Sequence, residues 1–257
     1  MSRTAGSVSA LAATGLVLAL AAAGAAALAG PAYRFHVLPL RDAFALLRWA
    51  AYGGGAAAAV SILGLVVRTR PGGPHKGLWA ALAGLILGAT VFWLPFSQMR
   101  AAGSVPPIHD ITTDTVNPPE FRAVVPLRPK GANSLAYGGD ALARQQHEAY
   151  PNIRPATFDV APKVVFAAAL EVARGMGWRI VDSAPGQGRI EAVATTFWFG
   201  FKDDVVVRVA GAGPGTRVDV RSVSRVGVSD VGTNARRIRK FLARLRSKID
   251  AERASRP

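Results

Sequence analysis

The first hundred residues of the chain are dominated by three apolar segments. They extend over residues 7–30, 44–67 and 77–96, and Arg48 is the only charged residue in them. About 20 apolar residues in a helix are enough to cross the hydrocarbon core of a bilayer. Buried helices of a soluble core are the alternative, but three such segments in succession favour membrane-spanning helices, so residues 1–99 are expected to form a transmembrane region.

The pattern changes near residue 100. Proline and glycine recur between residues 100 and 161, which makes long regular elements improbable and predicts an extended, ordered arm of a water-soluble domain. From Pro162, apolar residues recur at helical spacing up to Gly175 and Gly177, so a first helix is expected there.

Strictly alternating apolar residues in the next part of the chain predict four β-strands. The expected strands are Trp178–Ser183, Arg189–Phe199, Val205–Val209 and Val218–Ser224. Short turns between them predict antiparallel pairing, and an amphipathic helix is expected from about Asp230 to Ala251. Residues 162–257 are therefore predicted to form an α+β core, an antiparallel sheet of about four strands with two helices packed on one face.

The positive charges in the loops indicate the orientation in the membrane. Three cations lie between Arg68 and Lys76, which favours a cytoplasmic second loop, although the opposite side carries nearly as many. The domain after Phe96 is then expected on the periplasmic side of a bacterial inner membrane. Residues 1–29 also fit a signal peptide, with Arg3 before the apolar segment and Ala27-Leu28-Ala29 as a cleavage site, but the length of the segment favours an uncut helix. Cleavage would leave the final side unchanged.

The composition of the chain limits the reactions and partners to be expected. The chain has no cysteine, which excludes disulfides, thiolate catalysis and cysteine-ligated metals. A net charge of +15 is typical of nucleic-acid binding, yet the excess is shared by both halves of the chain, and an anionic membrane surface explains it equally well. The expected partners are the lipid bilayer and, beyond it, anionic lipid headgroups or a membrane protein. Neither nucleic acid nor a cofactor is expected.

Several short blocks occur in a characteristic order in the second half of the chain. They are His109–Asp114 with Asn117-Pro118-Pro119, Tyr150–Pro155, Met176-Gly177-Trp178, Gly188–Ala192, Asp203–Arg208, and Arg221–Gly227 with Ser229-Asp230 and Asn234-Ala235. Together they resemble the domain of unknown function family 1499 over roughly residues 105–249. The resemblance implies a domain found in bacterial and plastid-type membrane settings, and it implies no established reaction.

A polar stretch of the arm is the first candidate site. Its candidate binding residues are His109, Asp110, Thr112, Thr113, Asp114 and Asn117. Such oxygens suit a hard cation, but the spacing fits neither an EF-hand nor a helical zinc site. We favour the alternative that these side chains satisfy backbone groups in successive turns, and we expect no catalytic metal.

The arginines of the last strand are the second candidate. Arg217, Arg221 and Arg225 are predicted on one face, and the strand leads into a helix start at Ser229-Asp230. Arginines beside a helix N-terminus suit an anion such as phosphate, with Arg221, Arg225 and Ser229 as binding residues. Against this, Ser229 or Asp230 would cap the helix, and strand arginines often pair with neighbouring carboxylates.

Catalytic residues are hard to assemble from this sequence. No serine lies in a G-x-S-x-G turn, and the adjacent Asp203 and Asp204 point to opposite faces of their strand. The sequence therefore favours a membrane-anchored, non-enzymatic binding or structural module for an anionic headgroup or a membrane partner. A metal-dependent or hydrolytic enzyme centred on His109 to Asp114 is the alternative.

Overall fold

The structure, a computed structural model, describes residues 9–68 and 76–254. The chain divides into two compact units. The first comprises Met1–Ala101 with Trp198–Gly200, and the second comprises Ala102–Phe197 with Phe201–Pro257. Arg3 and Arg70, two of the cations used to predict the orientation, lie outside the described residues.

Three long helices form the first unit. They are α1 (Ala10–Arg34), α2 (Leu40–Arg68) and α3 (Leu78–Gly103). By length and composition, all three are long and apolar enough to cross a membrane, which confirms the three predicted segments.

Small residues allow these helices to approach closely. A Cβ atom on Gly88 of α3 would lie 2.6 Å from the carbonyl oxygen of Gly54 in α2, and a Cβ atom on Gly15 or Gly84 would collide with Ser61. Helices in lipid associate through such close backbone packing, because the surrounding lipid tails remove the hydrophobic drive that acts in water.

The second unit is an α+β domain, as predicted. Its elements are β1 (Asp110–Thr112), the 3-10 turn η1 (Val125–Leu127), α4 (Gly139–Ala149), β2 (Ala156–Phe158), α5 (Pro162–Gly175), β3 (Arg179–Ala184), the 3-10 turn η2 (Pro185–Gln187), β4 (Arg189–Thr195), β5 (Lys202–Ala212), β6 (Gly215–Ser224) and α6 (Thr233–Ala254). The strand order is β1-β6-β5-β4-β3, with β2 also paired to β6, and every pairing is antiparallel.

The sheet has six strands where about four were expected. The two additional strands come from the arm and share the edge of β6, with Asp110 opposite Val223 and Ala156 opposite Val218. Each has three residues, too few for an alternating pattern to be visible in the sequence. The arm also contains α4, so it is more regular than its prolines and glycines suggest.

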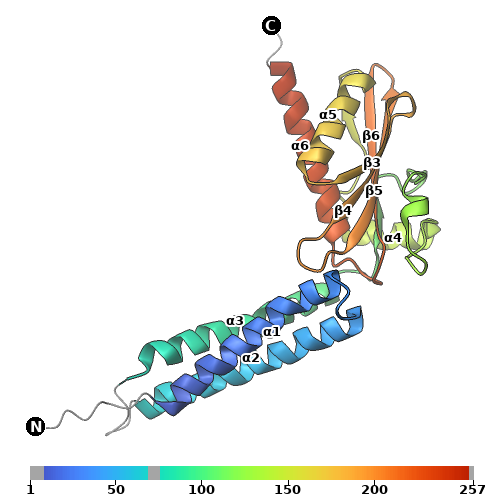
Figure 1. Ribbon diagram of the computed structural model, residues 1–257. Coiled ribbons are helices and arrows are strands. Elements are labelled where there is room, and N and C mark those ends of the chain that lie inside the picture. Colours follow the sequence, from blue (N-terminus) through green and yellow to red (C-terminus); the bar gives the residue numbers. More distant parts are fainter. Residues whose placement is uncertain (1–8, 69–75, 255–257) are drawn as a thin grey trace, which may run out of the picture. The chain divides into compact units, whose positions relative to one another are not determined.

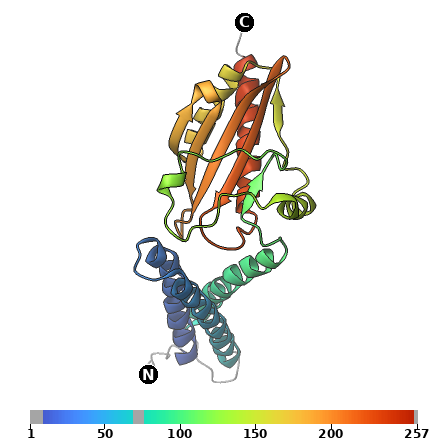
Figure 2. The same cartoon turned by 90° about the vertical axis from the view of Figure 1, so that its right-hand side faces the viewer.

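Both faces of the sheet are covered. Figure 1 shows α5 and α6 together on one face, and Figure 2 shows the arm crossing the opposite face. The main core lies on the helix side, where Trp178 stacks on Phe241 of α6 with ring centroids 5.2 Å apart. A smaller cluster lies under the arm, where Phe121 and Val124 pack on apolar residues of the strands.

Two predicted boundaries differ from the structure. The strand expected to reach Phe199 ends at Thr195, because Thr196 and Phe201 close a turn through two hydrogen bonds. The last helix begins at Thr233, three residues later than expected, because the carboxylate of Asp230 accepts hydrogen bonds from backbone amides of the first turn.

Candidate functional site

A buried ion pair joins the arm to the last strand. Arg221 of β6 donates from Nε and Nη2 to the two carboxylate oxygens of Asp110, at 3.0 and 2.7 Å. The same guanidinium group donates to the backbone carbonyls of Pro119 and Leu135 in the arm, at 3.3 and 2.8 Å. Arg221 and Asp110 are 3% and 4% exposed, so the charge of Arg221 is neutralised by a carboxylate inside the domain.

Two aromatic rings enclose this guanidinium group. The rings of Phe121 and Tyr137 lie 5.3 and 5.4 Å from its central carbon, a distance suited to cation–π attraction. Burial is the main reason why the pKa of Tyr137 is raised to about 12, and the negative charge of Asp110 adds to the rise. The positive charge of Arg221 lowers this pKa by a smaller amount. Tyr137 is therefore a neutral phenol at physiological pH.

Arg225 lies in a second buried ion pair. Its guanidinium group binds both carboxylate oxygens of Asp204 on β5 at 2.7–3.1 Å and also donates to the carbonyl of Leu127 at 3.0 Å. Arg128 of the arm contacts the same carboxylate. The two candidate arginines thus hold the arm on the sheet.

Asp114 belongs to a third ion-pair group, which is partly exposed. Its Oδ2 accepts hydrogen bonds from Arg208 and Arg217, both at 2.9 Å, and the two arginines also share Asp219. The hydrogen bond that Arg217 donates to Asp219 is the main reason why the pKa of Arg217 is raised. The Oδ1 of Asp114 accepts from the backbone amides of residues 116 and 117, a turn of the kind expected from the sequence.

The threonines of the arm also form internal hydrogen bonds. The backbone of Thr112 exchanges two hydrogen bonds with the buried amide of Gln146, at 2.9 and 2.8 Å. Thr113 accepts from the amide of Val220 at 2.9 Å and donates to Asp219 at 3.4 Å. Both threonines are buried.

His109 and Ser229 lie on either side of the turn that leads into α6. The Nδ1 of His109 is 3.2 Å from the carbonyl oxygen of Val228, and Ser229 accepts from the backbone at position 231. Burial raises the pKa of Asp230, against the two backbone hydrogen bonds that lower it. The carboxylate of Asp230 occupies the helix N-terminus where an anionic ligand was considered.

The structure therefore brings Asp110 to Arg221, and it places Asp114 in contact with Thr112, Asn117 and Arg217. Arg225 binds Asp204 instead, and His109 and Ser229 lie at the turn before α6. Within the described ranges 9–68 and 76–254, no three histidine, aspartate or glutamate side chains converge as metal ligands.

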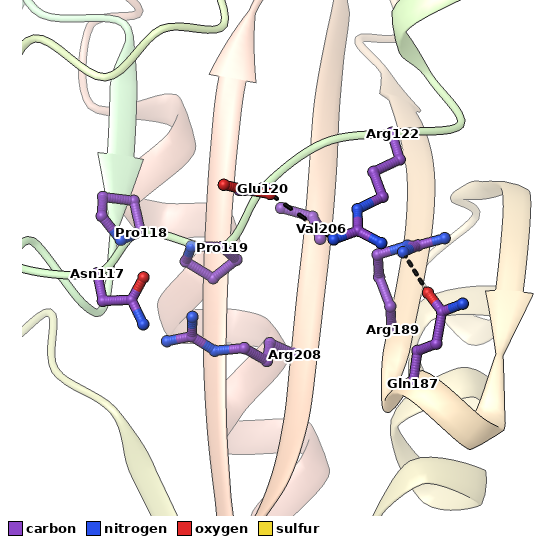
Figure 3. Close-up of a pocket in the computed structure, with 9 residues that line it drawn as sticks. All are labelled: Asn117, Pro118, Pro119, Glu120, Arg122, Gln187, Arg189, Val206 and Arg208. Atoms are coloured by element: carbon purple, nitrogen blue, oxygen red, sulfur yellow. Dashed lines mark hydrogen bonds and ion pairs between the residues drawn. The ribbon is translucent and has the colours of Figure 1, made fainter.

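A cavity of about 330 Å³ lies between the arm and the strands (Figure 3). Its lining residues are Asn117, Pro118, Pro119, Glu120, Arg122, Gln187, Arg189, Val206 and Arg208. Of these, only Asn117 was a candidate from the sequence. No sequence pattern indicated the other lining residues, because the placement of Arg189 directly opposite Arg208 on β4 and β5 exists only in the folded sheet.

Two like charges opposite each other on a sheet are normally unfavourable. Here carboxylates compensate each of them. Arg189 is bound by Asp182 at 2.9 Å and lies 3.0 Å from Glu191, and Arg208 is bound by Asp219 at 2.9 Å. The arginines are thus fixed in place along the cavity wall.

The outer face of α6 is the other strongly charged surface. Arg236, Lys240 and Arg244 are all exposed. None of them forms an ion pair with a carboxylate in the described part of the chain. We call these three residues the basic face of α6.

Fold and charge distribution define a membrane-anchored protein whose α+β domain is held together by buried arginine–carboxylate pairs. Residues 110–245 match the family described as Protein of unknown function (DUF1499), so the chain belongs to this family, as the sequence blocks indicated. A comparison with curated proteins found no match.

Proposed function

We propose that this protein is a non-enzymatic binding module of the bacterial envelope, anchored in the inner membrane by α1, α2 and α3. Its α+β domain lies on the periplasmic side and engages anionic lipid headgroups through the basic face of α6. Three spans and the cations from Arg68 to Lys76 support this orientation.

The single observation that carries the proposal is the unpaired charge of the basic face. Arg236, Lys240 and Arg244 follow one another at intervals of four residues, so they share one side of the helix. Like charges at this spacing destabilise a helix. Among the described residues, no carboxylate forms an ion pair with these three cations to compensate their charge. Such a row is more easily explained by an external negative partner than by the stability of the fold.

Arg221 of β6 and Arg225, which directly follows this strand, do not carry the proposal. Arg221 and Arg225 are buried and bound to Asp110 and Asp204. Their guanidinium groups already donate to carboxylate and carbonyl oxygens inside the domain, and a ligand would have to displace a carboxylate.

A bilayer surface suits the basic face better than a shaped ligand does. The three cations lie on one side of an exposed helix, and each Lys or Arg near an anionic bilayer contributes about 1 kcal/mol of attraction. Removing two of them is therefore expected to weaken binding by up to about 30-fold at low salt.

The test uses the full chain in nanodiscs of neutral lipid, mixed with phosphatidylglycerol vesicles and sedimented. The test variant carries Lys240→Gln and Arg244→Gln. The matched control carries Lys130→Gln and Arg144→Gln, which removes two exposed cations on the arm and α4. We expect the test variant to lose most of the binding and the control to lose little.

Equal losses in the two variants would show that diffuse positive charge attracts the vesicles and would reject the basic face as the site. If the wild-type chain does not bind anionic vesicles, lipid headgroups are excluded as the ligand, and an acidic membrane protein becomes the expected partner.

A further inference from the structure

The cavity between the arm and the strands is separate from the basic face of α6. We propose that it binds a small, water-soluble oxyanion, a carboxylate or a phosphate, through Arg122, Arg208 and Asn117. Its volume of about 330 Å³ is in the range of small-ligand sites.

Arg208 is a donor that is already oriented. Its Nε and Nη2 are bound by Asp219, and Nη2 is also bound by Asp114, at 2.9–3.2 Å. No described residue accepts a hydrogen bond from its Nη1, and Figure 3 shows the guanidinium group directed toward Asn117. Because neighbouring carboxylates fix this side chain, a ligand would not have to order it, which favours binding.

Arg122 is a second donor on the opposite side of the cavity. Its side chain is 61% exposed, and the nearest carboxylate oxygen, on Glu120, is 3.8 Å away, which is too far for a hydrogen bond. Figure 3 shows that this side chain lies beside Arg189. An oxyanion held by Arg122 and Arg208 would receive a charge-assisted hydrogen bond from each guanidinium group.

The charge around the cavity limits the ligand to a small anion. Three arginines and one carboxylate, Glu120, line the cavity, and the carboxylates that fix Arg189 and Arg208 lie behind them. With Glu120 these carboxylates number five, against the three lining arginines and Arg217, so the site has no net positive charge and an anion would be held by directed hydrogen bonds. A single carboxylate or phosphate group therefore suits the site better than a polyanion does.

The cavity lies away from the point where the chain enters the domain. The chain enters beside the end of β6, where the carbonyl of His109 accepts from the amide of Ser224 and the amide of Arg225 donates to the carbonyl of Lys202. Arg208 lies six residues further along β5 than Lys202, a distance of roughly 20 Å along a strand.

Equilibrium dialysis of the full chain in neutral nanodiscs tests the proposal, with radiolabelled inorganic phosphate and radiolabelled acetate as separate probes. We expect saturable binding of at least one probe at one site per chain. Arg122→Gln should weaken it about tenfold, which corresponds to one charge-assisted hydrogen bond. Asn117→Ala should weaken it several-fold. Arg144→Gln, the same charge change on α4, should leave it within twofold of wild type.

Three results would overturn the proposal. One is the absence of saturable binding of both probes by the wild-type chain. A second is an equal loss in Arg122→Gln and Arg144→Gln, which would mean that net charge alone attracts the probe. Displacement of the bound probe by phosphatidylglycerol vesicles, but not by phosphatidylcholine vesicles, would reassign the cavity to lipid headgroups and reject a water-soluble ligand. Since Lys240→Gln with Arg244→Gln should leave the dialysis result unchanged, failure here is distinguishable from failure of the basic face.

Discussion

Replacing Arg221 by alanine is expected to destabilise the domain strongly. The substitution removes two hydrogen bonds to Asp110 and two to arm carbonyls from a side chain that is 4% exposed. Asp110 would keep a buried carboxylate with no other donor among the described residues. Removing one partner of a buried ion pair costs about 3–5 kcal/mol, mostly because the remaining charge is left unpaired.

Hydrogen exchange measured by mass spectrometry, on the full chain in nanodiscs, can follow the change in the peptides that contain β6. We expect the free energy of opening to fall by about 4 kcal/mol in Arg221→Ala. Arg144→Ala, an exposed arginine on α4, should change it by less than about 0.5 kcal/mol.

The double variant Asp110→Ala with Arg221→Ala separates the buried charge from lost packing. It should be more stable than Arg221→Ala alone, because no unpaired carboxylate remains. A loss below about 1 kcal/mol in the single variant, or a double variant no better than the single one, would refute this reasoning.

Three further predictions concern the arm, pH and topology. Glu191 is fully buried and accepts hydrogen bonds from the backbone amides of Arg122 and Val124 at 2.9 and 3.0 Å. Glu191→Ala should therefore speed hydrogen exchange of these two amides by at least about tenfold. Unchanged exchange would contradict the role of Glu191 in holding the arm. Burial raises the folded-state pKa of Asp230 above its ordinary value of 3.8, so the folded domain binds this proton more tightly, and the contribution of this group to stability should decline as pH rises from about 3.8 through the raised pKa. Thermal unfolding across this pH range should show a smaller decline in Asp230→Asn, and an identical slope would contradict the assignment. Alkaline phosphatase fused to the C-terminus should be active if the domain is periplasmic, whereas activity of only a cytoplasmic reporter would reverse the topology.

The candidate residues were visible in the sequence, but their partners were not. Asp110 and Arg221 both stand out as charged residues in patterned segments, yet they are 111 positions apart. Their pairing depends on β1, a three-residue strand whose register on β6 no local pattern specifies. The cavity was not anticipated for the same reason, since Asn117, Arg122 and Arg208 come from segments that only the folded arm brings together.

The sequence by itself determined the features that depend on local pattern. Apolar runs of 20 residues or more need no tertiary context to indicate spanning helices, and alternation and helical spacing identify β3 to β6, α5 and α6 because each period matches one secondary structure. Only the tertiary structure decided how the arm lies. Its strands are too short to show a period, and its path across the sheet depends on buried pairs such as Arg225 with Asp204. The tertiary structure also decided that Arg221 and Arg225 are buried. A guanidinium group on a strand face is exposed or buried according to what covers that face. Here the face is covered by the arm, a segment about a hundred residues earlier in the chain.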